Sequence, residues 1–401
     1  MKPLNGLKVI AFEQYGAGPF GTQYLADMGA DVIKVERPGT QGDFVRPLGP
    51  YFTNDDPDDT ARSLFFQSCN RNKRSLTLDI THTQGREILH HLVSKADATA
   101  NNLRGDVPAK LGLDYAHLGQ VNAAIVCAHC SAYGREGSRR HWPGFDFLMQ
   151  AECGYFYLNG EPSSPPGRMG LSVVDYMGGM SMALGLVSGV LSARTSGQGR
   201  DIDVNLYQTA LFNINYQASW ALNAGYEPQR QPRSAHPSLV PCQLYTTKDG
   251  WIYLMCNRES FWPVLCHQID RPDLADNQAY ANFADRLARR DELTEILDDV
   301  LRTRTTQEWL TRFKGKVPAA PVLTPTQALD HDLVHEHNLV QTLHDSQGNP
   351  FKQLTPPIHT GDEEHPSDRP APALGADTDD ILQNLGYDEK KIRRLRRDKI
   401  V

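Results

Sequence analysis

A run of eighteen residues without a charge, from Tyr176 to Ala193, constrains the fold of this chain more than any other stretch. Asp175 precedes the run and Arg194 follows it. The length approaches that of a transmembrane helix. The run also contains four glycines and three serines, which favour a core helix whose small residues let other backbones approach closely. Gly185 and Gly189, four residues apart, are expected to form a flat groove on one face of it.

Asp175 is predicted to lie at the N-terminus of this helix, where the helix dipole favours an ionised carboxylate. Its position leaves two interpretations open. The side chain could act only as an N-cap that accepts backbone N–H groups, or it could be a reactive carboxylate. No Glu stands at position 178 to complete a capping box, because that residue is Gly178. The preceding residues 162–168 form a Pro- and Ser-rich loop of the kind that borders functional sites.

Length and charge set the broad class. The 401 residues suggest two domains. A net charge of −7 gives no general attraction to nucleic acid or to an anionic membrane, so neither is expected as a partner. The basic residues between Lys390 and Lys399 are interpreted as a solvated helix face. The N-terminal residues contain no apolar signal region, and we expect a cytoplasmic protein.

Two groups of cysteines and histidines could in principle bind a metal ion. Cys127-x-x-Cys130 is the only CxxC among seven cysteines, and it is interpreted as two thiols on a buried strand. His331, His335 and His337 are close in sequence, but no further ligand follows at a fixed spacing. No metal site is therefore expected.

The first residues predict a strand–helix–strand unit. An apolar strand over Leu7–Phe12 precedes the pattern Gly16-x-Gly18-x-x-Gly21, a helix over Thr22–Met28 and a strand over Asp31–Val35. Glu36 lies twenty residues after Gly16, where dinucleotide-binding folds place their ribose ligand, so NAD binding is one alternative. Pro19 weakens it, since proline removes a backbone donor from a phosphate loop.

Further strands are predicted over Leu76–Ile80, near Ala98, over Ala123–Ala128 and over Asp201–Asn205, with helices between them. This alternation indicates a mostly parallel sheet covered by helices on both faces. Ligands of such sheets bind at the carboxyl ends of the strands, where Arg37, Asn102 and Arg104 are placed. Polar, Pro-rich residues 225–233 mark a boundary, and residues 234–322 read as a smaller α+β domain.

In order along the chain, these pieces resemble the class III CoA-transferase family, which includes formyl-CoA transferase and the alpha-methylacyl-CoA racemases. The resemblance spans nearly the whole chain. It rests on Pro3-Leu-x-Gly6-Leu-x-Val9, residues 29–38 (GADVIKVERP), Asn72-Lys73-Arg74-Ser75, residues 112–115 (GLDY), Gly197-x-Gly199-x-x-Ile202-Asp203-Val204, His236-Pro237-Ser238, Pro321-Val322 and Leu374-Gly375.

The resemblance implies an α/β fold: a Rossmann-like large domain built from residues 1–224 and 326–401, a small inserted α+β domain over residues 225–325, and an interlocked homodimer. It implies coenzyme A as part of an acyl-CoA substrate, and no permanently bound cofactor. The residues it assigns to the CoA cleft are Gly16, Ala17, Arg37, Leu78, Asp79, Asn102, Leu103, Arg104, Lys110, Gly144, Phe145 and Asp146. Residues 102–106 (NLRGD) depart from the family's Asn-Phe-Arg-Pro-Gly by lacking its aromatic residue and its proline.

The resemblance also makes Asp175 the catalytic nucleophile, which would carry first an acyl group and then CoA. Racemases of the family share this Asp but place a His immediately before a second Asp, where this chain has Phe145 before Asp146. Phe cannot transfer a proton, so a CoA-transferase is the preferred interpretation. A racemase-like isomerase, a non-catalytic CoA-binding protein and an NAD oxidoreductase are the alternatives.

The acids that exchange CoA are less constrained by the sequence. The glycine-rich loop of formyl-CoA transferase has no counterpart in residues 234–245, which disfavours oxalate or formate. Arg46, Arg168 and His236 are each candidates to hold a second carboxylate, as a dicarboxylate such as succinate would require.

Overall fold

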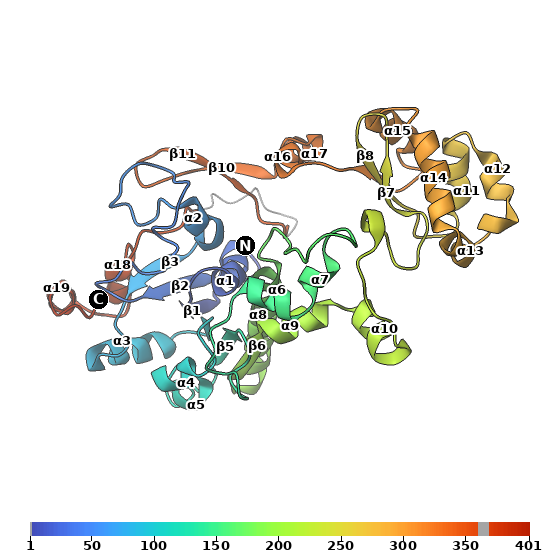
Figure 1. Ribbon diagram of the computed structural model, residues 1–401. Coiled ribbons are helices and arrows are strands. Elements are labelled where there is room, and N and C mark those ends of the chain that lie inside the picture. Colours follow the sequence, from blue (N-terminus) through green and yellow to red (C-terminus); the bar gives the residue numbers. More distant parts are fainter. Residues whose placement is uncertain (1, 360–368) are drawn as a thin grey trace. The chain divides into compact units, whose positions relative to one another are not determined.

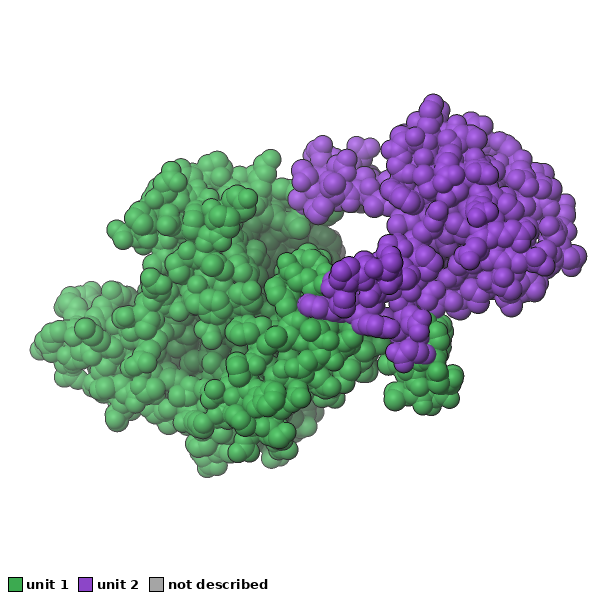
Figure 2. Space-filling view, viewed as in Figure 1, with its two compact units in different colours: residues 1–155, 168–226, 338–401 green, residues 156–167, 227–337 purple. Residues whose placement is uncertain are grey.

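The computed structural model describes residues 2–359 and 369–401. The chain divides into two compact units, coloured separately in Figure 2. The larger unit contains residues 1–155, 168–226 and 338–401, and the smaller unit contains residues 156–167 and 227–337. The sequence placed these boundaries at 224/225 and 325/326, and it did not separate residues 156–167 from the large domain.

A six-stranded sheet forms the centre of the larger unit (Figure 1), with strand order β3-β2-β1-β4-β5-β6. All five strand pairs are parallel, and this confirms the predicted α/β class. The strands are β1 (Lys8–Phe12), β2 (Asp31–Glu36), β3 (Arg74–Thr77), β4 (Ala98–Asn101), β5 (Val126–Ser131) and β6 (Arg200–Asn205).

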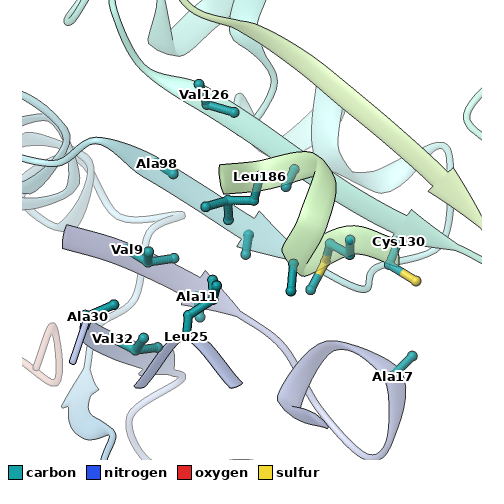
Figure 3. Packing of buried hydrophobic residues seen from close by; sticks show 14 of the residues in the cluster. Val9, Ala11, Ala17, Leu25, Ala30, Val32, Ala98, Val126, Cys130 and Leu186 are labelled. Carbon is teal, nitrogen blue, oxygen red and sulfur yellow. The ribbon is translucent and has the colours of Figure 1, made fainter. Parts of the chain in front are cut away.

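Side chains of β1 contribute to two hydrophobic cores, one on each face of the sheet, because successive side chains of a strand point to opposite faces. Val9 and Ala11 pack with α1 (Ala17–Asp27) and α8 (Val173–Ser196), as Figure 3 shows for part of this cluster. Ile10 and Phe12 pack on the other face with apolar residues of α3 (Thr83–Val93), α18 (Thr378–Asn384) and α19 (Glu389–Arg397). Helices therefore cover both faces of the sheet.

Helix α8 is the predicted core helix. It has the length and apolar composition of a membrane span, but half of its most apolar window is buried inside the protein, which is usual for a core helix. Gly185 and Gly189 face the sheet: a Cβ atom at either position would lie within 3 Å of Ile202 or Val126 side-chain atoms. Side chains of the sheet, rather than another backbone, therefore lie against these two glycines, and the close backbone approach occurs instead at Gly179.

The secondary structure of Gly16, Gly18 and Gly21 differs from the prediction, which placed these residues before the helix. They do not form a loop, because α1 begins at Ala17 and Gly16 is its N-cap. Pro19 lies in the first turn of that helix, where its missing N–H group costs nothing. Gly21 permits the closest contact between the two helices, since a Cβ atom there would lie 2.3 Å from the carbonyl oxygen of Gly179 in α8.

The remaining elements of the larger unit are shorter. Residues 206–224 form two helices instead of one, because Asn215 has a φ of +56° and interrupts the helical backbone. The elements are α2 (Leu64–Asn70), α4 (Val107–Leu111), α5 (Tyr115–Leu118), α6 (Asp146–Glu152), α9 (Leu206–Asn213), α10 (Tyr216–Ala224) and the antiparallel pair β10 (Val340–His344) and β11 (Pro350–Leu354). A further short helix, α7 (Tyr155–Leu158), begins at the last residue of one segment of this unit.

The smaller unit has an antiparallel sheet, β7-β8-β9, with its own apolar core. The mixture of an antiparallel sheet and helices agrees with the predicted smaller α+β domain. Its strands are β7 (Cys242–Thr246), β8 (Trp251–Met255) and β9 (Ala319–Pro321). Its helices are η1 (Pro232–Ser234), α11 (Phe261–Gln268), α12 (Pro272–Asp276), η2 (Gln278–Tyr280), α13 (Phe283–Ala288), α14 (Arg290–Leu301), α15 (Thr306–Phe313), α16 (Pro325–Leu329) and α17 (Asp332–Glu336).

Candidate active site

Asp175 lies in the first turn of α8 and is 4% exposed. It is not the N-cap, which is Ser172, and the Ser172 side chain makes no capping hydrogen bond. The Asp146 carboxylate takes that role from a different helix: its Oδ2 atom accepts from the N–H groups of Val174 (2.6 Å) and Asp175 (2.9 Å). The interpretation of Asp175 as a simple cap is therefore wrong, and its carboxylate is left for another role.

The Asp175 carboxylate faces Gly16. A Cβ atom at Gly16 would lie 2.3 Å from Asp175 Oδ2, so no other residue type fits there without moving the carboxylate. Gly16 is thus required by a close approach to Asp175. Within residues 2–359 and 369–401, no hydrogen bond to the Asp175 side chain is present.

Burial and the nearby Asp146 carboxylate raise the pKa of Asp175 to about 7. Burial also raises the pKa of Asp146, although the hydrogen bonds from Asp175, Val174 and Gln150 oppose this effect. The sequence predicted that the helix dipole favours an ionised Asp175. The structure adds two opposing effects, burial and the like charge of Asp146, and with a pKa of about 7 the carboxylate is about half ionised at pH 7.

Tyr15 precedes Gly16 and has a left-handed backbone conformation, with φ at +68°. Such a conformation is uncommon outside glycine and asparagine. Its N–H group donates to Asp43 Oδ1 (3.1 Å), and Asp43 is in turn paired with the buried Lys34 at 2.9 Å. The Tyr15 ring stacks on Phe44 and meets the Phe145 ring edge-on. The sequence did not single out Tyr15 or Asp43, since neither residue belongs to a recognisable motif.

A pocket of about 350 Å³ opens at the carboxyl ends of β1, β2 and β3. Its apolar wall includes Phe12, Val35, Leu78, Ile80, Leu103, Leu111 and Leu113, and its polar lining includes Arg37 and Asp79. Arg37 and Asp79 are 3.6 Å apart. Four of the residues predicted to bind CoA, namely Arg37, Leu78, Asp79 and Leu103, therefore line one cavity. Gln14, at its edge, is two residues from Gly16.

Three other predicted residues, Asn102, Arg104 and Lys110, do not line this pocket but are next in sequence to Leu103 or Leu111, which do. The Asn102 amide pairs with the backbone of Gln14, accepting from its N–H (2.9 Å) and donating to its carbonyl (2.7 Å). Arg104 and Lys110 both bind Asp106, at 2.6 and 2.5 Å. Asn102 thus holds the segment between the pocket and Gly16, and Asp106 offsets much of the positive charge expected there.

The other members of the predicted set do not line this pocket. Ala17 is buried, and its carbonyl oxygen faces Gly179. Gly144 packs against Ala132 and is followed by Phe145, which is 53% exposed, and by Asp146. Asp146 acts on Asp175 directly rather than on the pocket.

Glu36 cannot bind a ribose. Its carboxylate accepts from Arg46 Nε (2.7 Å) and Nη2 (2.5 Å), from Ser75 Oγ (3.0 Å) and from the Asp43 N–H (2.9 Å). Glu36 and Arg46 are both buried. The NAD interpretation is therefore wrong, and Arg46 is not available to hold a second carboxylate of a substrate.

The other two proposed carboxylate-binding residues lie in different units. His236 belongs to the smaller unit, where its Nδ1 atom accepts from the Ser238 and Leu239 N–H groups. Burial and Arg290 lower the pKa of His236, so the neutral ring is favoured. Arg168 belongs to the larger unit, and its guanidinium lies 4.2 Å from the centre of the Phe147 ring.

The candidate metal ligands are dispersed. The described part of the chain contains no group of three or more His, Cys, Asp or Glu side chains arranged to hold a metal ion. His331 caps α17 through its Nδ1 atom. Cys127 and Cys130 are free thiols on the buried strand β5, which confirms that interpretation.

A family model described as CoA-transferase family III matches residues 4–378. The chain belongs to this family. It is 30% identical over 397 residues to a succinyl-CoA:glutarate CoA-transferase of Mus musculus, covering 98% of this chain and 89% of the relative. It is 32% identical over 344 residues to a succinyl-CoA:mesaconate CoA-transferase of Haloarcula hispanica, covering 85% of each. An acetyl-CoA:oxalate CoA-transferase of Acetobacter aceti is 32% identical over 328 residues, covering 81% of this chain and 82% of the relative.

Two solved structures agree with the fold over nearly the whole chain. A CaiB/BaiF family protein from Brucella suis matches with a TM-score of 0.80 and 30% identity, covering 96% of this chain and 99% of that chain. The Rv3272 protein of Mycobacterium tuberculosis matches with a TM-score of 0.83 and 28% identity, covering 95% and 99%. This protein is therefore an enzyme of the CoA-transferase class, and its substrates include a CoA thioester.

Proposed function

We propose that this enzyme moves CoA from an acyl-CoA to a free organic acid, with Asp175 as the nucleophile. The observation that carries the proposal is a buried carboxylate without a side-chain hydrogen bond in the described residues, facing Gly16 at the start of α8. A carboxylate with no competing partner retains its nucleophilicity. Burial also keeps water from the anhydride that it would form.

The reaction would proceed in four substitutions at carbonyl carbon. Asp175 attacks the thioester, forming a mixed anhydride and releasing CoA thiolate. The thiolate attacks the Asp175 carbonyl carbon, which forms an aspartyl-CoA thioester and releases the first acid as a carboxylate. The acceptor carboxylate then attacks this thioester, and the thiolate returns to the acceptor's acyl carbon. Asp175 is regenerated, and no redox partner or net proton is needed.

The CoA position follows from the pocket beside β1–β3. The apolar wall formed by Leu78, Ile80 and Leu103 suits a flat adenine ring, and Arg37 suits a phosphate. The pantetheine arm would then follow Gln14 toward Gly16 and Asp175. Asn102 supports this path because it holds the Gln14 backbone at both its N–H and its carbonyl.

Phe145 disfavours the racemase alternative. Deprotonation and reprotonation at one carbon need two proton-transferring groups on opposite sides of the substrate. The residue before Asp146 is an exposed phenylalanine in contact with Tyr15, and it cannot exchange a proton.

The relatives support small organic acids, including dicarboxylates, as the acids exchanged, because two of the three named above use succinyl-CoA. We also propose a homodimer. Met180, Leu184 and Leu191 form an exposed apolar stripe on α8, at 43%, 71% and 70% exposure, which a second copy would cover. A molar mass from light scattering would test this. The interlocked form of that dimer and a cytoplasmic location remain predictions.

Trapping of the acyl-enzyme intermediate with hydroxylamine tests whether Asp175 is the nucleophile. The enzyme is incubated with succinyl-CoA and treated with hydroxylamine, and peptides are examined by mass spectrometry. We expect a hydroxamate on Asp175, formed only when acyl-CoA is present and absent in Asp175→Asn. Wild-type enzyme that exchanges CoA without any label on Asp175 would overturn the proposal. Binding of acyl-CoA with neither exchange nor label would instead support a CoA-binding protein.

A further inference from the structure

One exposed, positively charged side chain lies at the edge of the Asp175 site. Arg168 stands five residues before the start of α8 at Val173. Its guanidinium lies over the Phe147 ring at 4.2 Å, and Phe147 directly follows Asp146. The ring therefore holds the guanidinium beside the helix turn that caps α8.

A buried amide fixes the segment that follows Arg168. Gln150 is fully buried, and its Oε1 atom accepts from the Met169 N–H at 3.0 Å. Its Nε2 atom donates to the Leu171 carbonyl (2.9 Å) and to Asp146 Oδ1 (2.5 Å). One side chain thus joins the backbone on which Arg168 lies to the carboxylate that caps α8. Arg168 is positioned relative to Asp175 by the same hydrogen bonds that position Asp146.

The charge of Arg168 reaches the site. It acts on both Asp146 and Tyr15, where it lowers the pKa of each group against the larger effect of burial. A carboxylate entering this region would meet two acidic groups, so it needs a compensating cation, and the planar guanidinium of Arg168 can bind it through two hydrogen bonds.

We propose that Arg168 binds the distal carboxylate of a short dicarboxylic acid while its other carboxyl group reacts at Asp175. The inference rests on the proposed function and narrows its acid to this chemical class. Arg168 is then the residue that separates dicarboxylates from monocarboxylates of the same length. The Phe147 ring would contact the methylene chain or hold the guanidinium in place.

The test compares acceptors matched in chain length: succinate with butyrate, and glutarate with valerate. CoA transfer is measured for the wild type, Arg168→Gln, Arg168→Lys and the control Arg194→Gln, which alters an exposed arginine at the other end of α8. For Arg168→Gln we expect KM for the dicarboxylates to rise about 10- to 100-fold, while kcat/KM for the monocarboxylates stays within about 3-fold of wild type. Arg168→Lys should recover part of the loss, because it keeps the charge but not the planar fork. Arg194→Gln should change neither.

The possible results distinguish a role of Arg168 in substrate binding from a structural role. Equal losses with both acid classes would overturn the inference, because they would show that Arg168 only positions Asp146 or the loop. Unchanged KM values in Arg168→Gln would overturn it as well. A wild type that prefers monocarboxylates would also overturn it while leaving Asp175-dependent transfer intact. If the wild type transfers CoA to no acid and Asp175 is not labelled by acyl-CoA, the proposed function fails first.

Discussion

The Asp146 Oδ2 atom accepts a hydrogen bond of 2.9 Å from the backbone N–H of Asp175, so one carboxylate orients the helix end on which the other lies. Burial raises the pKa of Asp175, and the nearby charge of Asp146 raises it further. Asp146 therefore has two opposed effects. It stabilises the first turn of α8, and it disfavours the ionised form of Asp175 that attack on a thioester requires.

Activity should depend on pH through Asp175. The attacking form is the carboxylate, and the pKa of Asp175 is about 7, so kcat/KM for an acyl-CoA should rise through about pH 7 and level off above it. Initial rates at low acyl-CoA concentration, measured from about pH 5 to about pH 9 in buffers of constant ionic strength, would check this. A rate that falls across this range would show that a protonated group limits the reaction instead.

Replacing Asp146 by asparagine should move that midpoint to lower pH. The asparagine amide keeps an oxygen that can accept from Val174 and Asp175, but the substitution removes the like charge. The midpoint should stay above the ordinary Asp value of 3.8, because burial is the larger cause of the shift. Gln150 loses its carboxylate acceptor, which should cost about 1 kcal/mol of stability. Asp146→Ala is the comparison, since it removes the charge and the cap together. An unchanged midpoint in Asp146→Asn would contradict this electrostatic coupling.

Asp175→Asn should stabilise the protein while it abolishes CoA transfer. The folded-state pKa of Asp175 is raised from 3.8 to about 7, so ionisation costs stability: the cost is absent below about pH 3.8, grows as pH rises and is complete above about pH 7. Asparagine avoids this cost. The free energy of unfolding of the variant should therefore exceed that of the wild type at about pH 8 by a few kcal/mol, and by much less at about pH 4. Urea unfolding at both pH values measures the difference, and a gap independent of pH would be evidence against a shifted Asp175.

Gly16→Ala should lower activity with little loss of stability. The Gly16 backbone, with φ at −103° and ψ at −79°, accepts alanine, but the new methyl group would lie 2.3 Å from Asp175 Oδ2. The carboxylate would have to move, and a displacement of this size can reduce kcat/KM by about 100-fold. Gly250→Ala is the matched control, since the nearest atom to its new Cβ is 4.0 Å away. Wild-type activity in Gly16→Ala would mean that Asp175 reacts from another position.

Arg37→Ala should weaken CoA binding more than it slows turnover. The Arg37 side chain is 68% exposed at the pocket, with Asp79 at 3.6 Å, and it is placed to contact a phosphate. We expect the Kd for CoA to rise about 10-fold, and kcat at saturating acyl-CoA to change by less than about 3-fold. Calorimetric titration with CoA measures the first quantity. Arg302→Ala, in the smaller unit, is the control, and an identical Kd in both variants would remove Arg37 from the CoA site.

The central sheet could be predicted because parallel strands buried on both faces appear as short apolar runs. The ends of β3 and β5 were less predictable. The apolar residues Leu78 and Ile80 follow the end of β3 at Thr77. They belong to the hydrophobic core, but they do not pair with β2 in the sheet. The start of α1 was missed because its first five residues include Gly18, Pro19 and Gly21, which are residue types that usually indicate a loop.

The position of Asp175 at a helix start could also be predicted, but its surroundings could not. Asp146 caps α8 from 29 residues away, and no local pattern shows such a pairing. The ionisation of Asp175 was misjudged for the same reason, since the helix dipole is visible in sequence while burial and a like charge are not. Tyr15 has a left-handed backbone held by Asp43, and the residue type gives no sign of it.

The contact between Gly21 and Gly179 leaves no room for a side chain on either helix. Helices α1 and α8 therefore form one closely packed piece of the fold, and under the proposed function an acyl-CoA would meet an Asp175 that already lies beside Gly16. Related enzymes that accept different acids are then expected to differ at replaceable side chains around that piece, such as Arg168 and Phe147, and to keep its two glycines.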